Sequence, residues 1–116
     1  TKDSESWDDI AVPALVMETA PDLVCGYHLA IVRSRKNVLS GGYLLRAFQA
    51  CAINQQFQVA ASGVTRYGLP KASIGDAWIS LPPLLEQQAI AEFLDRETGR
   101  MDRLMAKKRE LIERLK

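Results

Sequence analysis

The sequence predicts an α/β (α+β) chain in which a small mixed head, residues 1–83, is followed by one long coiled-coil-type helix, residues 84–116. In the head, short apolar segments alternate with turn signals such as Pro21-Asp22 and Ser62-Gly63, as in a compact domain. In the second part, helix formers dominate to the last residue. Hydrophobic residues at 47% and charged residues at 25% are ordinary globular values. We therefore expect a buried core in the head.

Strands and helices are both expected in the head. β-branched and aromatic residues favour one strand over residues 23–33 and a shorter one over 77–81. Ser40 is a suitable N-cap for a helix whose apolar residues continue to Cys51. A second helix is predicted over residues 54–61, where Ser62-Gly63 ends it.

The long helix carries a heptad pattern. A helix from Leu85 to Lys116 holds 32 residues and spans about 48 Å, so it must project from the head or lie along a partner. With position a at Gln87, six of nine a and d positions are apolar. These six predicted helix-pairing residues are Ile90, Leu94, Met101, Leu104, Leu111 and Leu115. The polar interruptions fit a partner helix as well as a second copy.

Composition excludes several classes of protein. No stretch approaches the roughly 20 apolar residues that span a bilayer, and the acidic, polar start is unlike a signal peptide. We expect a cytoplasmic protein. Cys25 and Cys51 lack CxxC spacing, so neither zinc nor a disulfide is indicated, and buried, reduced thiols are predicted.

The formal net charge of +1 conceals a division along the chain. Residues 1–22 carry six acidic residues against one lysine, whereas residues 23–80 carry six basic residues against Asp76 alone. The middle of the chain is therefore a candidate anion-binding region. Scattered cations that only solubilise a small domain would give the same count, and this alternative stays open.

Catalytic motifs are weak. Cys25 and the single histidine, His28, would point to opposite faces of an alternating strand, so a Cys–His nucleophile is not expected. The head has no carboxylate cluster for a metal or a glycosidase pair. The pair Gly41-Gly42 lacks the spacing of a phosphate-binding loop.

The segment 63–70 is the best candidate for binding. Its glycines allow the backbone to approach a ligand, Arg66 offers a guanidinium fork suited to phosphate or guanine, and Tyr67 can stack beside it. Two tight turns and a core tyrosine explain the same residues equally well.

The stretch Leu81-Pro82-Pro83-Leu84-Leu85-Glu86-Gln87-Gln88-Ala89-Ile90-Ala91-Glu92-Phe93-Leu94-Asp95 resembles the specificity subunit of type I restriction-modification systems. In that family a target recognition domain ends in a Leu-Pro-Pro-Leu turn, and a Glu-Gln pair opens a long helix. Looser similarity covers Cys25-Gly26-Tyr27-His28-Leu29 and Ser62-Gly63-Val64-Thr65-Arg66-Tyr67-Gly68-Leu69. Leu85 replaces the proline or small residue often found there. Because a complete subunit has two recognition domains and two helices, we expect this chain to be a piece or a half-sized version of one.

The resemblance implies a non-catalytic subunit that binds double-stranded DNA and scaffolds other subunits. It implies no cofactor in this chain, since S-adenosylmethionine belongs to methyltransferase subunits, and ATP and Mg²⁺ are expected in the partner subunits that include the restriction subunit. It also implies that the long helix pairs antiparallel with a counterpart and docks the methyltransferases. A coiled-coil adaptor that never touches DNA is the alternative.

The predicted DNA contacts follow from the basic, glycine-flanked segment. Thr65, Arg66 and Tyr67 are expected to face DNA. Less specific phosphate contacts are expected from Arg33, Arg35, Lys36 and Lys71. No catalytic and no metal-binding residue is predicted. A fragment without its partner helix should self-associate through the helix-pairing residues.

Overall fold

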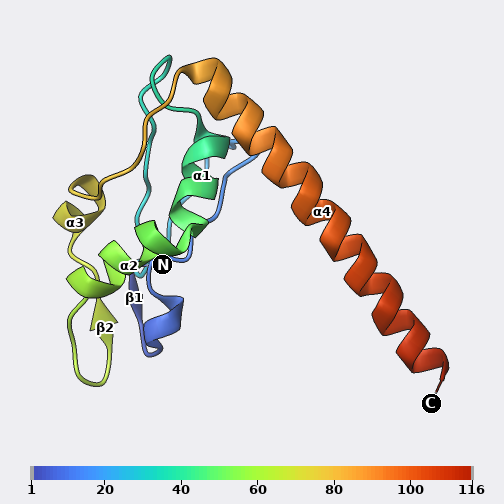
Figure 1. Ribbon diagram of the computed structural model, residues 1–116. Coiled ribbons are helices and arrows are strands. Elements are labelled where there is room, and N and C mark those ends of the chain that lie inside the picture. The colour runs from blue at the N-terminus through green and yellow to red at the C-terminus, as the bar shows by residue number, and fades with distance from the viewer. Residues whose placement is uncertain (1, 116) are drawn as a thin grey trace.

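The computed structural model describes residues 2–115 and consists of a small head from which one long helix projects as an arm (Figure 1). Its secondary structure is, in chain order, β1 (Asp3–Ser4), a 3-10 turn (Trp7–Asp9), α1 (Gly41–Gln49), α2 (Cys51–Ala60), β2 (Tyr67–Gly68), α3 (Lys71–Gly75) and α4 (Leu84–Arg114). The predicted mixed head and long C-terminal helix are thus confirmed.

The two predicted head helices are present, with one boundary moved. Ser40 caps α1, since its side-chain oxygen accepts a hydrogen bond from the Tyr43 N–H at 3.5 Å. Ala50 takes an extended conformation with ψ of 134° and separates the helices, so α2 begins at Cys51 rather than at residue 54. Cys51 is consequently exposed, and the prediction of a buried thiol there is wrong. Cys25 is only partly buried.

The small core lies where the beginning of the chain meets α2. Its buried residues are Ile10, Ala11, Phe57, Ala61 and Leu69. Phe48 of α1 packs edge-on against Phe57, with ring centroids 5.0 Å apart. β1 and β2 run antiparallel beside this core, with Asp3 opposite Gly68. The first residues of the chain therefore hold the segment around Tyr67 in place.

The predicted strands over residues 23–33 and 77–81 are absent. The described residues offer no neighbouring strand to the first segment, whose backbone reaches β1 only where the His28 carbonyl accepts from the Lys2 and Asp3 N–H groups. In the second segment, the backbone groups of Trp78 are hydrogen-bonded by the side chain of Gln56 and not by a neighbouring strand. The Gln56 amide accepts from the Trp78 N–H at 2.8 Å and donates to its carbonyl at 2.9 Å. Without a backbone partner, strand propensity produces no strand in either segment, and a turn at Tyr27-His28 interrupts the first one.

The root of α4 is fixed to the head through Gln87, whose side chain is fully buried. Its amide nitrogen donates to the carbonyls of Val38 at 2.9 Å and Pro82 at 2.8 Å, and its oxygen accepts from the Ser40 N–H at 2.9 Å. Gln87 therefore joins α4 to the loop before α1 and to the segment before α4. The heptad pattern treats this residue as a polar interruption, but it anchors the helix to the head.

A second set of contacts continues this attachment along α4. Arg46 of α1 donates to the Asp95 carboxylate, with Nε 2.8 Å from Oδ1, and to the Thr98 hydroxyl at 3.0 Å. Ala91 is buried beside Gly42, where an added Cβ would lie 3.6 Å from the Ala91 Cβ. Beyond Thr98 the helix leaves the head. No helix within residues 2–115 is long and apolar enough to cross a bilayer.

Candidate functional site

The segment between Ser62 and Gly68 forms a closed loop with a projecting tip. The Ser62 N–H donates to the Gly68 carbonyl at 3.1 Å, and the Gly68 N–H donates back at 2.9 Å. Gly63 has φ of +151°, and an added Cβ would lie 1.9 Å from the Arg66 carbonyl oxygen. Only glycine fits this position. The close approach that Gly63 permits is thus to its own chain, which turns the tip outward.

The tip presents the residues that were predicted to face a ligand. Thr65 and Arg66 are exposed. Arg66 forms an ion pair with Glu5, NH1 to Oε1 3.6 Å, in which its side chain stays 48% exposed and that of Glu5 82%. Tyr67 is half-buried and packs edge-on against Trp7, with centroids 5.0 Å apart. Tyr67 therefore packs the base of the loop against Trp7, whereas Thr65 and Arg66 are exposed to solvent.

The acidic start of the chain lies against this loop. Asp3 of β1 accepts hydrogen bonds from Lys2 Nζ at 3.0 Å and from His28 Nδ1 at 3.3 Å, if that nitrogen carries the proton. The hydrogen bond from Lys2, aided by His28, holds the pKa of the Asp3 carboxyl below its ordinary value. The lowered pKa keeps the Asp3 carboxylate negative beside the loop at neutral pH, and Glu5 lies in an ion pair with Arg66.

The other predicted cations form a separate group. Arg33, Arg35 and Lys36 are exposed on the loop that precedes α1, and the neighbouring Val38 carbonyl is bonded to α4. This loop lies near the root of α4, at the other end of the head from the tip at residues 63–66 (Figure 1). Lys71 is exposed at the start of α3. The structure therefore does not bring the seven predicted contacts into one continuous surface.

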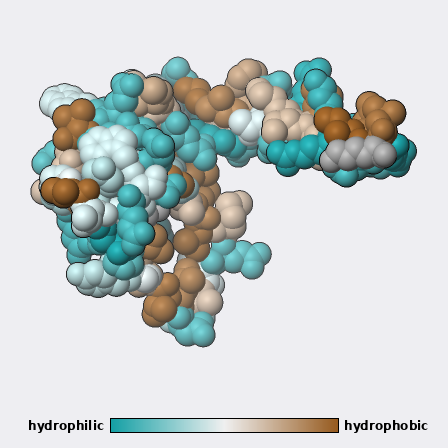
Figure 2. Space-filling model, turned by 90° about the horizontal axis from the view of Figure 1, so that it is seen from below, coloured by the Kyte–Doolittle hydropathy of each residue, from teal (hydrophilic) through white to brown (hydrophobic). Residues whose placement is uncertain are grey.

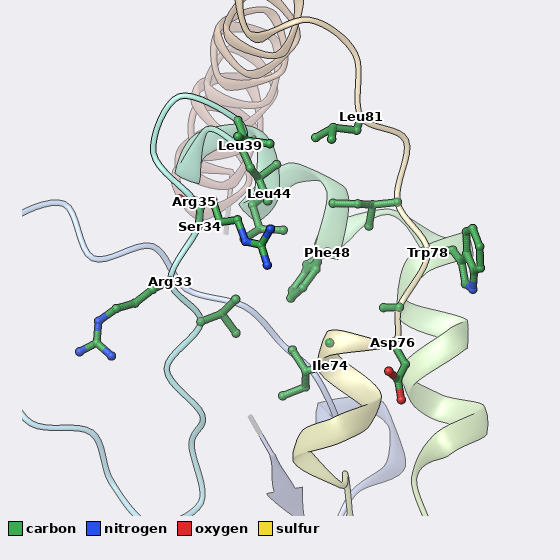
Figure 3. Close-up of a pocket in the computed structure, with 15 residues that line it drawn as sticks. Arg33, Ser34, Arg35, Leu39, Leu44, Phe48, Ile74, Asp76, Trp78 and Leu81 are labelled. Atoms are coloured by element: carbon green, nitrogen blue, oxygen red, sulfur yellow. The ribbon is translucent and has the colours of Figure 1, made fainter.

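A hollow of about 700 Å³ lies beside this second group. Most of its lining is apolar and comes from α1, α3 and the extended segments on either side, as Figure 3 shows. Phe48 and Ile74 point into it, Arg35 points toward Leu44, and Arg33 points away. Such a hollow has no converging acid, base and nucleophile.

The remaining chemistry-bearing side chains are dispersed. His28 contacts Asp3, whereas the Cys25 thiol lies against the Gly26 carbonyl at 3.4 Å. No group of His, Cys, Asp or Glu side chains among residues 2–115 is arranged to hold a metal ion. The described chain thus offers an exposed loop and an exposed arm.

A comparison with models of protein families identifies the family of this chain. A family model described as the type I restriction modification DNA specificity domain matches residues 20–114. The chain belongs to this family. No curated protein and no solved structure matches the chain significantly. The specificity domain is a recognition domain for DNA in type I restriction-modification systems, and the resemblance predicted from the sequence is confirmed.

The matched part of the specificity domain contains all seven predicted DNA contacts and the whole of α4. The segment before residue 20 lies outside the match but contributes Glu5 to the loop and Ile10 to the core. Sequence reasoning missed this role of the acidic start. The opposite charges of residues 1–22 and 23–80 were the available signal.

The specificity domain presents the predicted helix-pairing residues in two different environments. Ile90 and Leu94 are half-buried on the part of α4 that packs on the head, whereas Met101, Leu104, Leu111 and Leu115 are exposed. Sequence reasoning missed two neighbours on the same side, since Met105 and Ile112 occupy position e of consecutive heptads and are 49% and 55% exposed. We call the exposed set the distal apolar face: Met101, Leu104, Met105, Leu111, Ile112 and Leu115.

Proposed function

We propose that the chain reads one part of a bipartite DNA target as a specificity subunit, or part of one, in a type I restriction-modification complex. The observation that carries this proposal is the exposed 63–66 tip within a member of the DNA specificity domain family. Base recognition needs a side chain that reaches a groove edge. Arg66, on a projecting loop, meets this requirement best.

The loop is built for such a role. Gly63 closes it, Trp7 and Tyr67 support it, and Thr65 and Arg66 remain free to approach a groove. Because the Arg66–Glu5 pair is exposed, its net stabilisation is in the range of about 0–1 kcal/mol, and DNA phosphate or guanine can displace Glu5. Glu5 then acts as a weak competitor that disfavours poorly matched DNA.

The arm supports the scaffolding part of the proposal. The distal apolar face lies outside the head along the outer half of α4, and brown apolar side chains gather toward the end of the arm in Figure 2. We propose that a counterpart helix and the methyltransferase subunits cover this face and that the restriction subunit joins the same cytoplasmic complex. S-adenosylmethionine, ATP and Mg²⁺ would act in those partner subunits.

Substitution of Arg66 in an assembled complex tests the DNA-reading role. Arg66→Ala is expected to reduce methylation at the cognate site by about ten- to a hundredfold and to relax the base preference, because one good side chain–base contact contributes about 1–3 kcal/mol. Val64→Ala is a matched control in the same loop, since Val64 is 93% exposed and uncharged. Unchanged rate and site choice for Arg66→Ala would exclude this role.

The coiled-coil adaptor is the second candidate, and the exposed distal apolar face favours it. The two functions differ in their response to salt. DNA binding releases counterions, so log affinity falls steeply as log salt rises. An adaptor shows no DNA affinity at low salt, and that result would leave the arm as the functional part of the chain.

A further inference from the structure

A row of cations follows one side of α4, from the end of its inner half outward. Arg96, Arg100, Arg103 and Lys107 are separated by four, three and four residues and are all exposed. At 3.6 residues per turn this spacing keeps the four side chains within a sector of about 60°, and at 1.5 Å per residue they cover about 16 Å of the helix axis. We call them the basic face of α4.

Part of this row encloses a shallow hollow. Arg100, Arg103, Leu104 and Lys107 line a space of about 290 Å³. Three of these four residues are cations, and no carboxylate lines the hollow. A single phosphate group could enter such a space and contact more than one cation.

The charges of the basic face are only partly neutralised. Glu97 forms ion pairs with Arg96 and Arg100, with its carboxylate oxygens 3.5 Å from Arg96 Nε and 3.9 Å from Arg100 NH1. Within residues 2–115, neither Arg103 nor Lys107 forms an ion pair. A solvated helix surface commonly pairs such charges at i and i+4. Two successive unpaired cations beside a hollow are therefore available to an external anion.

The basic face and the distal apolar face point in different directions. With 100° per residue, their centres lie about 110° apart around the helix axis. A helix packed on the distal apolar face would leave Arg103 exposed, because Arg103 lies about 140° around the helix from the centre of that face. The arm can hold a partner helix and an anionic ligand at the same time.

We propose that the basic face of α4 binds the phosphate backbone of duplex DNA without regard to base sequence. Each DNA strand carries one phosphate per 3.4 Å of helix axis, so a straight row of about 16 Å can face several phosphates. A run of one charge sign along a helix is the electrostatic pattern of nucleic-acid contact. The inference rests on DNA being the ligand of the proposed function, and it adds a second contact surface outside the recognition head.

Salt titration of the whole chain with a random-sequence 30-bp duplex tests this contact. Each neutralised phosphate contributes about 0.9 to the slope of log affinity against log salt. Replacing two contacts in Arg103→Gln/Lys107→Gln should lower the slope by about 1.8. The ratio of wild-type to variant affinity should then shrink about tenfold between roughly 50 and 200 mM salt.

A matched control is available on the same helix. Arg109 is exposed and lies about 150° around the helix from the basic face. Arg103→Gln should lower the slope by about 0.9, whereas Arg109→Gln, which removes the same charge, should leave it unchanged. An equal change in both variants would show a diffuse effect of net charge and would overturn the proposal. An unchanged slope in Arg103→Gln, in Arg103→Gln/Lys107→Gln and in the control variant would overturn it as well.

Failure of this inference is distinguishable from failure of the proposed function. If Arg66→Ala weakens binding to a cognate site and Arg103→Gln has no effect on any duplex, the head reads DNA and the basic face does not bind it. If Arg103→Gln lowers the slope and Arg66→Ala changes neither affinity nor site choice, the basic face stands and the recognition role of the loop fails. A wild-type chain that binds no duplex at low salt contradicts both.

Discussion

The two halves of α4 are one continuous helix with different sources of stability. Over residues 84–98, Gln87 and Ala91 are buried and Arg46 of the head reaches Asp95. Over residues 101–115 every side chain is exposed, including the distal apolar face. The inner half is stabilised by polar anchors to its own head, and the outer half has apolar residues with no cover. A continuous heptad pattern therefore does not mean a continuous interface.

The largest expected effect is on the outer half. Leu104→Glu should abolish self-association of the isolated chain, because each copy loses about 1.5–3 kcal/mol of side-chain burial and a carboxylate would enter the interface. Two copies change per pair, so the dissociation constant should rise at least a hundredfold. Analytical ultracentrifugation measures this constant directly.

Ala106→Glu is the control for that experiment, since Ala106 is exposed on the opposite side of the helix. It should associate like the wild type. A wild-type chain that stays monomeric at micromolar concentrations would contradict the assignment of the distal apolar face to pairing.

The next effect concerns the root of the arm. Gln87→Ala should lower the free energy of unfolding by about 3 kcal/mol, because the Ser40 N–H and the Val38 and Pro82 carbonyls each lose a buried partner. Urea unfolding followed by tryptophan fluorescence measures the loss. Gln88→Ala, at the exposed neighbour, should change stability by less than about 0.5 kcal/mol. Similar curves for the two variants would show that α4 is not anchored at Gln87.

A smaller loss is expected at the second anchor. Arg46→Ala should reduce stability by about 1 kcal/mol, since its partner Asp95 is 62% exposed and solvent screens the ion pair. The loss should shrink in high salt, which chemical denaturation at two ionic strengths would detect. Arg100→Ala, at an exposed position just before the outer half, should leave stability within about 0.5 kcal/mol of wild type.

The smallest effect lies at the boundary between the halves. Gly99 follows the last anchored residue, and an added Cβ would meet only the far end of Arg103 at 3.7 Å. Gly99→Ala should therefore stabilise the chain by about 0.5–1 kcal/mol through helix propensity, seen as a higher midpoint in thermal unfolding followed by circular dichroism. The reverse change, Ala106→Gly, should lower that midpoint. A loss of stability in Gly99→Ala would mean that the helix needs flexibility there.

The sequence predicted the elements that depend on local signals. Ser40 begins α1 as its capping chemistry requires, and helix formers continue α4 as far as Arg114. The strand predicted over residues 23–33 failed because β structure needs a second backbone, which the described residues do not supply along that segment. Propensity is local, whereas strand pairing is not.

In the candidate site too, the features that depend on local sequence could be predicted, whereas those that depend on distant residues could not. The exposed tip at Thr65 and Arg66 could be predicted from glycines and charge within one short segment. The partners of the site could not, since Glu5 lies far from Arg66 in the chain and Val38 lies 49 residues from Gln87. A polar residue at heptad position a indicates only that the seam is interrupted. Its burial among backbone groups of the head depends on the tertiary fold.

The attachment at Gln87 and Arg46 also sets the angle at which α4 projects from the head. An α-helix of 31 residues is about 46 Å long, so a change of 10° at its root moves its tip by about 8 Å. Along B-DNA, where one turn of about 10 base pairs occupies about 34 Å, that movement equals roughly two base pairs. Under the proposed function, in which such helices would space two half-targets, the tolerated gap between the half-targets would be limited by how stiffly a buried glutamine and an arginine hold this angle.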